Sequence, residues 1–170
     1  MAEVTAWLVL RAQAGELEAL DELFRAIQSP LHRYIAGLTP ERADADDILQ
    51  EVFVRIHRNL RWLRDPELFR AWAYRIATRE TWRHLRREQR RTEPIDDAAA
   101  IDAVEERLSP EVLSQLATSV AELSPASRAV ILLFYFHGLS LGDVAAALAI
   151  PIGTAKSRLA YGLKTLRRHV

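Results

Sequence analysis

Aromatic and arginine side chains alternate along residues 67–91, a combination that could bind nucleic acid. Trp72, Tyr74 and Trp82 stand among eight arginines in this segment. Every base has a flat π face, and stacking it on an aromatic ring is worth about 1–3 kcal/mol, while arginine also contacts the phosphates. The pattern therefore predicts a surface for unstacked bases. It leaves open whether Trp72 contacts bases or is a core residue behind a solvated arginine face.

The last helical segment, residues 153–168, offers a second such surface. Residues 152–170 contain five bases and no acid. At 100° per residue, five apolar residues lie within about 40° of one line and predict the buried stripe: Ile152, Ala155, Leu159, Leu163 and Leu166. The polar residues opposite or beside the stripe are Thr154, Lys156, Ser157, Arg158, Tyr161, Lys164 and Arg168. Short polar groups and cations without carboxylates suit contact with base edges and phosphates.

The residues before this segment predict a helix-turn-helix. Gly138 suits the left-handed position after an apolar helix, and Ser140 can cap the next helix, which ends near Leu148. Ala149-Ile150-Pro151 then turns the chain. Two short helices joined by a tight turn, the second of them basic, form the motif that places its second helix in the major groove.

A third set of residues, Asp46, Asp47, Gln50 and Glu51, forms an acidic helix face. Neighbouring carboxylates on one helix do not converge on a point, and no histidine stands at a metal-ligand spacing from them. We therefore expect docking of a basic partner here, with no metal site and no acid–base catalysis. The chain also lacks a phosphate-loop or nucleophile-elbow motif, so we expect no enzymatic activity and no cofactor.

Composition limits the remaining classes. The 170 residues have zero net charge, yet the charge is segregated: −6 over 1–54, +8 over 55–91, −7 over 92–122 and +5 over 152–170. The absence of cysteine excludes a disulfide scaffold, a thiol nucleophile and cysteine-ligated metal. No apolar run reaches the ~18–20 residues of a membrane span, and the first residues lack the order of a signal peptide. We expect a cytoplasmic protein without membrane insertion.

The elements that position these residues are predicted to be helices throughout. Apolar spacing predicts helices over 16–27 and, after Pro30, over 31–38; Asp44 is the expected N-cap of the next helix, and a fourth runs over 67–90. Residues 92–108 are acidic and lack periodicity, which indicates a flexible linker. The predicted fold class is all-α, with two small helical domains over 1–91 and 109–170, the second starting at Ser109-Pro110.

Three stretches in this order resemble the extracytoplasmic-function sigma factors, small two-domain initiation factors of bacterial RNA polymerase. The stretch 44–53 is similar to the segment of that family that docks on the clamp helices of the polymerase β′ subunit. The stretch 69–87 is similar to the segment that melts and reads the −10 element. The stretches 123–140 and 151–159 are similar to the helix-turn-helix that reads the −35 element, and the resemblance covers nearly the whole chain.

The resemblance implies a role for each set of residues. The residues implied to bind core polymerase are Asp46, Asp47, Gln50, Glu51 and Phe53. Those implied to bind −10 DNA are Arg61, Arg64, Trp72, Tyr74, Arg75, Arg79, Arg83, Arg86 and Arg87. Those implied to bind −35 DNA are Thr154, Lys156, Ser157, Arg158, Tyr161 and Lys164. The implied partners are core polymerase (β′ clamp helices and β flap), promoter DNA and, in many family members, an anti-sigma protein.

Two other interpretations remain open from the residues alone. The chain could be a regulator that binds an operator by itself through the helix-turn-helix. The sequence shows no evident dimer interface, however, and the aromatic and arginine residues of 67–91 would then be unexplained. It could also be a sigma-like decoy that sequesters an anti-sigma protein, although a decoy has no need of an acid-free last helix. The chain departs from the family at several positions. The family usually has Gly at the position of Ala149 and Asn at that of Arg79, and it often has Asp at that of Arg83.

Overall fold

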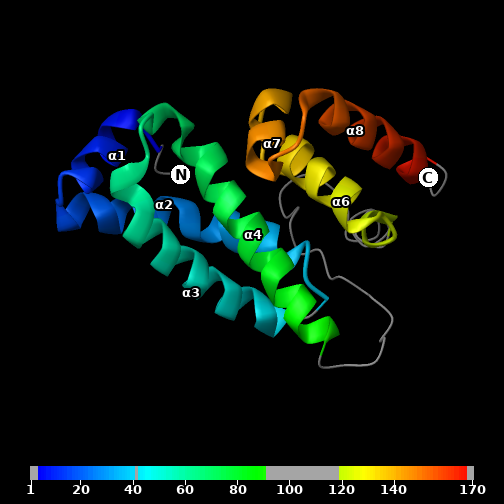
Figure 1. The fold of residues 1–170 in the computed structure, drawn as a ribbon, viewed down its shortest axis with the longest axis horizontal. Helices are drawn as coiled ribbons and strands as arrows, with labels where there is room; N and C mark the ends of the chain where they lie inside the picture. Colours follow the sequence, from blue (N-terminus) through cyan, green and yellow to red (C-terminus); the bar gives the residue numbers. More distant parts are fainter. Residues whose placement is uncertain (1–3, 41, 91–118, 168–170) are drawn as a thin grey trace, which may run out of the picture.

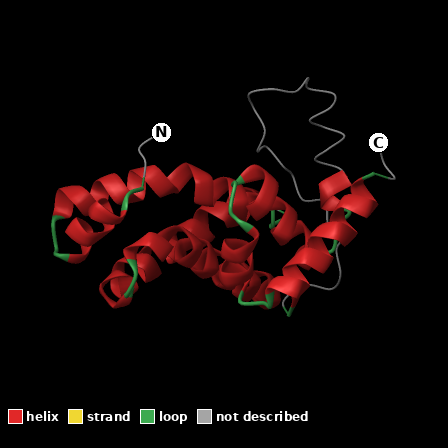
Figure 2. Ribbon diagram, turned by 90° about the horizontal axis from the view of Figure 1, so that it is seen from above, coloured by secondary structure: helices red, strands yellow, loops and turns green. Residues whose placement is uncertain are grey.

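A computed structural model describes residues 4–40, 42–90 and 119–167, and these residues form helices and loops without a strand (Figures 1 and 2). The N-terminal part contains α1 (Ala6–Gln13), α2 (Leu17–Ala36), α3 (Arg42–Asn59) and α4 (Phe69–Gln89), with the short 3-10 turns η1 (Leu60–Trp62) and η2 (Pro66–Leu68) before α4. The C-terminal part contains α6 (Pro125–Ile131), the π-helical turn η3 (Leu132–Phe136), α7 (Leu141–Leu148) and α8 (Ile152–Leu166). The all-α prediction is confirmed.

The N-terminal helices differ from the prediction in three places. Helix α1, capped by Thr5 with its hydroxyl accepting from the Leu8 amide at 3.2 Å, was not predicted. Helix α2 continues through Pro30 as one element, because residues on both sides of the proline are buried along the same face and tertiary packing outweighs one lost hydrogen bond. Asp44 lies inside the first turn of α3 and is not its N-cap.

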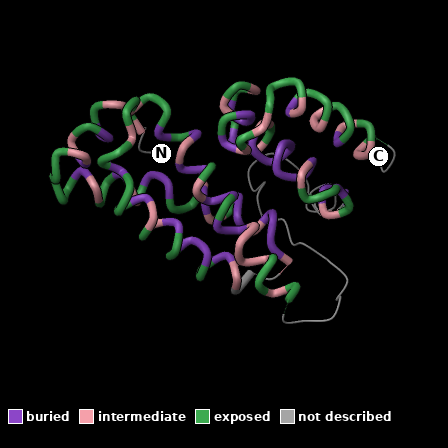
Figure 3. The backbone as a smooth tube through the Cα atoms, in the orientation of Figure 1, coloured by how far each residue is buried: buried purple, intermediate pink, exposed green. Residues whose placement is uncertain are grey.

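The core of the N-terminal part lies where α1, α2, α3 and α4 meet. Its largest fully buried side chains include Leu23, Tyr34, Ile56 and Phe69. Figure 3 shows the buried positions on the inner sides of the helices and exposed positions along the outer side of α8. The predicted linker, 92–108, and the predicted helix start at Ser109-Pro110 lie outside the described residues.

The C-terminal part forms the predicted helix-turn-helix. The Ser124 hydroxyl caps α6 and the Ser140 hydroxyl caps α7, where it accepts from the Asp143 amide at 3.1 Å. Gly138 has the left-handed conformation expected of it, with φ of +62°. Helix α8 packs on α6 and α7, and its Gly162 lies so close to Ile131 that an added Cβ would be 3.0 Å from that side chain.

Ala149 ends α7 in the left-handed conformation, with φ of 53° and ψ of 45°. A Cβ is strained there, whereas glycine adopts this conformation without that penalty. We expect Ala149→Gly to stabilise the C-terminal part by about 0.5–1 kcal/mol, because the left-handed Cβ penalty of about 1–2 kcal/mol exceeds the extra entropy that glycine loses on folding. Hydrogen exchange of the α7 and α8 amides measures this change. Ala146→Gly, on the exposed side of the same helix, is the matched control and should destabilise by about 1 kcal/mol. Equal destabilisation by both variants would contradict the expectation.

The two parts pack against each other along α4 and α7 (Figure 1). Buried residues of both parts belong to one continuous apolar cluster. At Gly37, the residue after α2, an added Cβ would lie 2.8 Å from a methyl group of Leu132 in η3. Glycine therefore permits the close approach of α2 to the C-terminal part.

Candidate nucleic-acid interface

Helix α4 and the loop before it present a basic surface. Six of the arginines predicted to bind DNA are exposed on this surface: Arg61, Arg64, Arg75, Arg79, Arg86 and Arg87. The guanidinium of Arg61 stacks 4.8 Å from the ring centroid of Trp62, and the Trp62 side chain is itself 69% exposed. This pair offers a flat apolar face beside a cation, the combination that binds an unpaired base and its phosphate.

The two aromatic residues predicted for this surface are placed differently. Trp72 is half-buried and packs beside Phe69, with ring centroids 5.9 Å apart. Tyr74 is only 2% exposed, because it faces the C-terminal part. In this arrangement of the two parts, the Tyr74 ring is therefore closed to any external ligand.

Arg83 is held by a buried carboxylate that the sequence analysis did not single out. Glu80 is 7% exposed and lies 2.9 Å from Nη1 of Arg83 and 2.6 Å from Nε of Arg55, which belongs to α3. A buried carboxylate needs partners of this kind, since an unpaired charge away from water is strongly unfavourable. Glu80 thus ties α4 to α3 and fixes the direction of Arg83. The spacing of Glu80 and Arg83, three residues apart on one helix, is the sequence signal that could have predicted this ion pair.

Helix α8 presents the second basic surface. Lys156, Ser157 and Lys164 are exposed and Tyr161 is 61% exposed, while Thr154 and Arg158 are half-buried. Of the predicted stripe, Ala155 is fully buried and the three leucines are half-buried, but Ile152 is 51% exposed. Ile152 is the first residue of the helix, where only the C-terminal side has a neighbouring turn to pack beside. Arg168 lies outside the described residues.

The acidic face lies on α3. Asp46, Asp47, Gln50 and Glu51 are all exposed, as predicted from their spacing. The Asp46 carboxylate lies 3.1 Å from Nε2 of His32 on α2. Phe53 departs from this face: it is half-buried and stacked on Phe24, with ring centroids 4.9 Å apart.

A polar aromatic cluster joins the two parts beneath the basic surface of α4. Nδ1 of His137, just after η3, is 2.9 Å from the Tyr74 hydroxyl, and Arg70 donates to the His137 carbonyl. Tyr34 packs edge-on against both rings, and its hydroxyl is 2.8 Å from that of Thr78. None of these contacts was predicted, because they join residues that are distant in the sequence.

The environment of this cluster keeps its histidine neutral. Burial, assisted by the positive charges of Arg33 and Arg70, lowers the pKa of His137 to about 3. Burial raises the pKa of Tyr74 to about 12, although Arg70 and Arg33 act in the opposite direction. Burial also raises the pKa of Tyr34. The groups facing the imidazole are thus two neutral phenols and two cations, and none of them stabilises a proton on it.

Acid should therefore separate the two parts. An exposed histidine has a pKa near 6.5, so the neutral ring contributes fully to packing above pH 6.5, and that contribution falls as pH drops below it. Between pH 7.5 and 5.5 we expect the ratio of separated to packed molecules to rise about tenfold. Energy transfer between dyes on Arg25→Cys and Ala160→Cys measures this ratio, since the chain has no other thiol.

The control for this titration is His137→Gln, which cannot gain a proton. It keeps the histidines of the N-terminal part, including His32 and His84, so any pH response that they cause remains. A response of the same size in the variant and the parent protein would rule out His137 as the titrating group.

Within the described residues, no helix is long and apolar enough to cross a membrane. The same residues contain no group of three or more histidine, aspartate or glutamate side chains that could hold a metal ion.

Comparison with protein families gives two matches, one for each part of the chain. The model of Sigma-70 region 2 matches residues 23–91. The model of Sigma-70 region 4 matches residues 113–166. The first match contains the acidic face and the basic surface of α4, and the second contains the helix-turn-helix.

Similar proteins of known class align over most of their length. The RNA polymerase sigma-E factor of Streptomyces antibioticus is 32% identical over 159 residues, covering 92% of this chain and 87% of the relative. The ECF RNA polymerase sigma factor SigC of Mycobacterium tuberculosis is 31% identical over 161 residues, covering 93% and 86%. The RNA polymerase sigma-H factor of Pseudomonas aeruginosa is 30% identical over 167 residues, covering 89% and 86%.

Two solved structures share the fold. The sigma factor RpoE of Bartonella quintana, in complex with the anti-sigma factor NepR, aligns with a TM-score of 0.80 at 20% identity and covers 90% of this chain and 97% of its own. CnrH in complex with the cytosolic domain of CnrY aligns with a TM-score of 0.73 at 23% identity and covers 98% and 96%. The paired helical domains are thus an arrangement known from experiment.

Proposed function

This chain belongs to the extracytoplasmic-function sigma factors, which direct bacterial RNA polymerase to promoters, and we propose that three of its surfaces share that work. The acidic face of α3 docks on core polymerase, the basic surface of α4 and its preceding loop takes the −10 element, and α8 takes the −35 element. The family consists of non-catalytic transcription factors, so the bond chemistry belongs to the polymerase.

The acidic face supports docking on the β′ clamp helices. Asp47 and Glu51 stand one turn apart on α3, both exposed, and Gln50 lies beside them. Exposed carboxylates of one sign attract a basic partner over about 8 Å at physiological salt. Phe53 packs on Phe24 and supports this part of α3, and its contact with core polymerase stays a prediction. The C-terminal domain would contact the β flap, as in the family.

The basic surface of α4 supports capture of the melted −10 strand. The exposed arginines contact phosphates, and the Arg61–Trp62 pair provides a stacking face beside them. Extruding a base from the duplex costs a few kcal/mol, which stacking of about 1–3 kcal/mol per base can offset for one or two bases. Tyr74 joins this surface only after it leaves His137.

Helix α8 supports entry into the major groove at the −35 element. Lys156, Ser157, Arg158 and Tyr161 lie nearest the base edges in this docking, while Lys164 contacts the backbone further along the helix. This acid-free surface on the second helix of a helix-turn-helix is the observation that carries the proposal, because a decoy would not need it. We also propose an anti-sigma partner, since the sigma factor RpoE is seen in complex with the anti-sigma factor NepR.

Run-off transcription tests the whole proposal. Genomic fragments are transcribed by purified core polymerase with and without this chain, and the start sites of chain-dependent transcripts define both promoter elements. We expect such transcripts, formed in the cytoplasmic setting where polymerase acts. Core binding without transcripts would support the decoy, and sequence-specific DNA binding without core binding would support the stand-alone regulator.

A further inference from the structure

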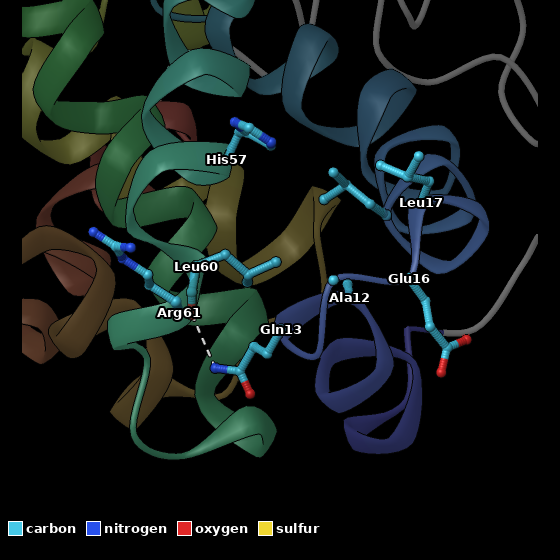
Figure 4. A pocket seen from close by; sticks show the side chains of 9 residues that line it. Ala12, Gln13, Glu16, Leu17, His57, Leu60 and Arg61 are labelled. Atoms are coloured by element: carbon cyan, nitrogen blue, oxygen red, sulfur yellow. Dashed lines mark hydrogen bonds between the residues drawn. The ribbon is translucent and has the colours of Figure 1, made fainter.

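Helix α1 packs beside the loop before α4, and one of its side chains makes hydrogen bonds to that loop. Gln13, the last residue of α1, uses both amide hydrogens: Nε2 donates to the Leu60 carbonyl at 2.9 Å and to the Leu63 carbonyl at 2.8 Å. These partners lie 47 and 50 residues away in the sequence. Figure 4 shows Gln13 directed toward Leu60, whereas the Arg61 side chain extends away from it.

The two carbonyls bracket the residues that present the stacking face. Leu60 begins η1, the Leu63 amide donates to the Leu60 carbonyl at 3.1 Å, and the turn between them carries Arg61 and Trp62. Leu60 is buried and Leu63 is half-buried, so the loop is anchored on its inner side at both ends. Its outer side presents Arg61, Trp62 and Arg64, which are all exposed.

The hydrogen bonds from Gln13 are the polar part of this anchor. A loop of this length has few backbone partners of its own, and ordering each residue costs about 1–2 kcal/mol in conformational entropy. A loop already ordered in the free protein does not incur that loss when a base arrives. The two hydrogen bonds from Gln13 add to the apolar anchors at Leu60 and Leu63 in ordering the loop before DNA binds.

We propose that Gln13 is a positioning residue for promoter melting: its amide holds the loop 60–64 in the conformation that receives an unpaired base of the −10 element. The inference rests on the proposed role of this loop. It adds a residue of α1 to those that affect recognition of the −10 element. Helix α1 precedes the residues matched by the region 2 model, which begin at Leu23.

Two substitutions at Gln13 with side chains of nearly the same size test whether its two donated hydrogen bonds matter, apart from its packing. Gln13→Glu replaces the donors with carboxylate oxygens, and Gln13→Met is neutral and lacks both. Each should raise hydrogen exchange of the loop amides in the free protein. On a duplex promoter recovered by the run-off experiment, each should lower open-complex formation at least about tenfold, the scale of two hydrogen bonds, and should weaken discrimination between −10 base variants.

Transcription from a premelted template distinguishes positioning from a general structural role. A structural defect would lower transcription on this template as much as on the duplex. The premelted template removes the cost of unpairing, so transcription by both variants should recover to within about threefold of the parent while core binding stays unchanged. The matched control is Asn59→Ala. Asn59 also donates an amide hydrogen to a backbone carbonyl at 2.8 Å, but that carbonyl belongs to Arg55 in its own helix. This control should behave as the parent protein on both templates.

Several results would overturn the inference. Parent-like loop exchange and parent-like melting in both Gln13 variants would show that the two hydrogen bonds do not order the loop. Equal losses on duplex and premelted templates, or loss of core binding, would show a structural role only. Failure of the parent protein itself to support transcription would count against the proposed function, while the exchange measurement would still decide whether Gln13 orders the loop.

Discussion

The variant Lys156→Ala/Arg158→Ala will lose initiation at promoters that depend on their −35 element, by at least about 30-fold, while it still binds core polymerase. A good base contact contributes about 1–3 kcal/mol of discrimination, so two contacts represent about 2–6 kcal/mol, and each 1.4 kcal/mol is a factor of ten. Run-off transcription on matched promoters with intact and altered −35 sequences measures the loss. In the variant the two promoters should become nearly equivalent.

The structure makes this variant easy to interpret. Lys156 is exposed and Arg158 half-buried, and the contacts of α8 with the core are made by Ala155 and the leucines of the stripe, so truncation opens no cavity. Alanine also favours a helix. Arg25→Ala/Arg58→Ala removes the same charge from exposed positions of the N-terminal domain and should leave the −35 preference intact. Retained discrimination in the α8 variant would remove both residues from the −35 assignment.

Reversal of two charges on α3 will prevent assembly with core polymerase. Asp47→Lys/Glu51→Lys replaces attraction by repulsion at two exposed positions one turn apart. Truncating one partner of a buried interfacial charge pair typically costs about 2–5 kcal/mol, and opposing like charges costs several more. We expect core affinity to fall by more than about 100-fold. Titration of core polymerase with labelled protein, repeated at two salt concentrations, gives the affinity and its electrostatic share.

The N-terminal domain contains a close match for this pair. Glu18 and Glu22 are likewise exposed, four residues apart on a single helix, and lie on α2. Glu18→Lys/Glu22→Lys makes the same change in net charge away from the proposed docking face, so it should bind core with nearly parent affinity. Equal weakening by both variants would mean that overall charge, rather than the α3 face, determines assembly.

Local patterns predicted the helices and faces that depend on residues close in sequence. The acidic face of α3 and most of the buried stripe of α8 follow from a 3.6-residue period, and Ser140 and Gly138 from backbone requirements at helix ends. Phe53 was assigned to core binding by the resemblance and not by its spacing; its ring is half-buried against Phe24, and its contact with core polymerase stays a prediction.

Local sequence patterns could not predict contacts between residues that are distant in the sequence. The Gln13 tether, the Arg55–Glu80 pair and the Tyr74–His137 contact each join residues at least 25 positions apart. The local preference of Pro30 predicts an interruption, whereas the packing that overrides this preference is tertiary. The burial of Tyr74 followed from the packing of the two domains, about which the sequence alone gave no information.

In the proposed function, Tyr74 links binding of the −10 element to binding of the −35 element thermodynamically. Tyr74 is buried while it contacts His137, so in the proposed function the −10 strand and the C-terminal domain would compete for this side chain. The apparent affinity for the −10 element is the intrinsic affinity multiplied by the fraction of molecules in which the pair is broken. By reciprocity, DNA that captures Tyr74 frees the helix-turn-helix to reach its own site, and the two contacts become cooperative without touching each other.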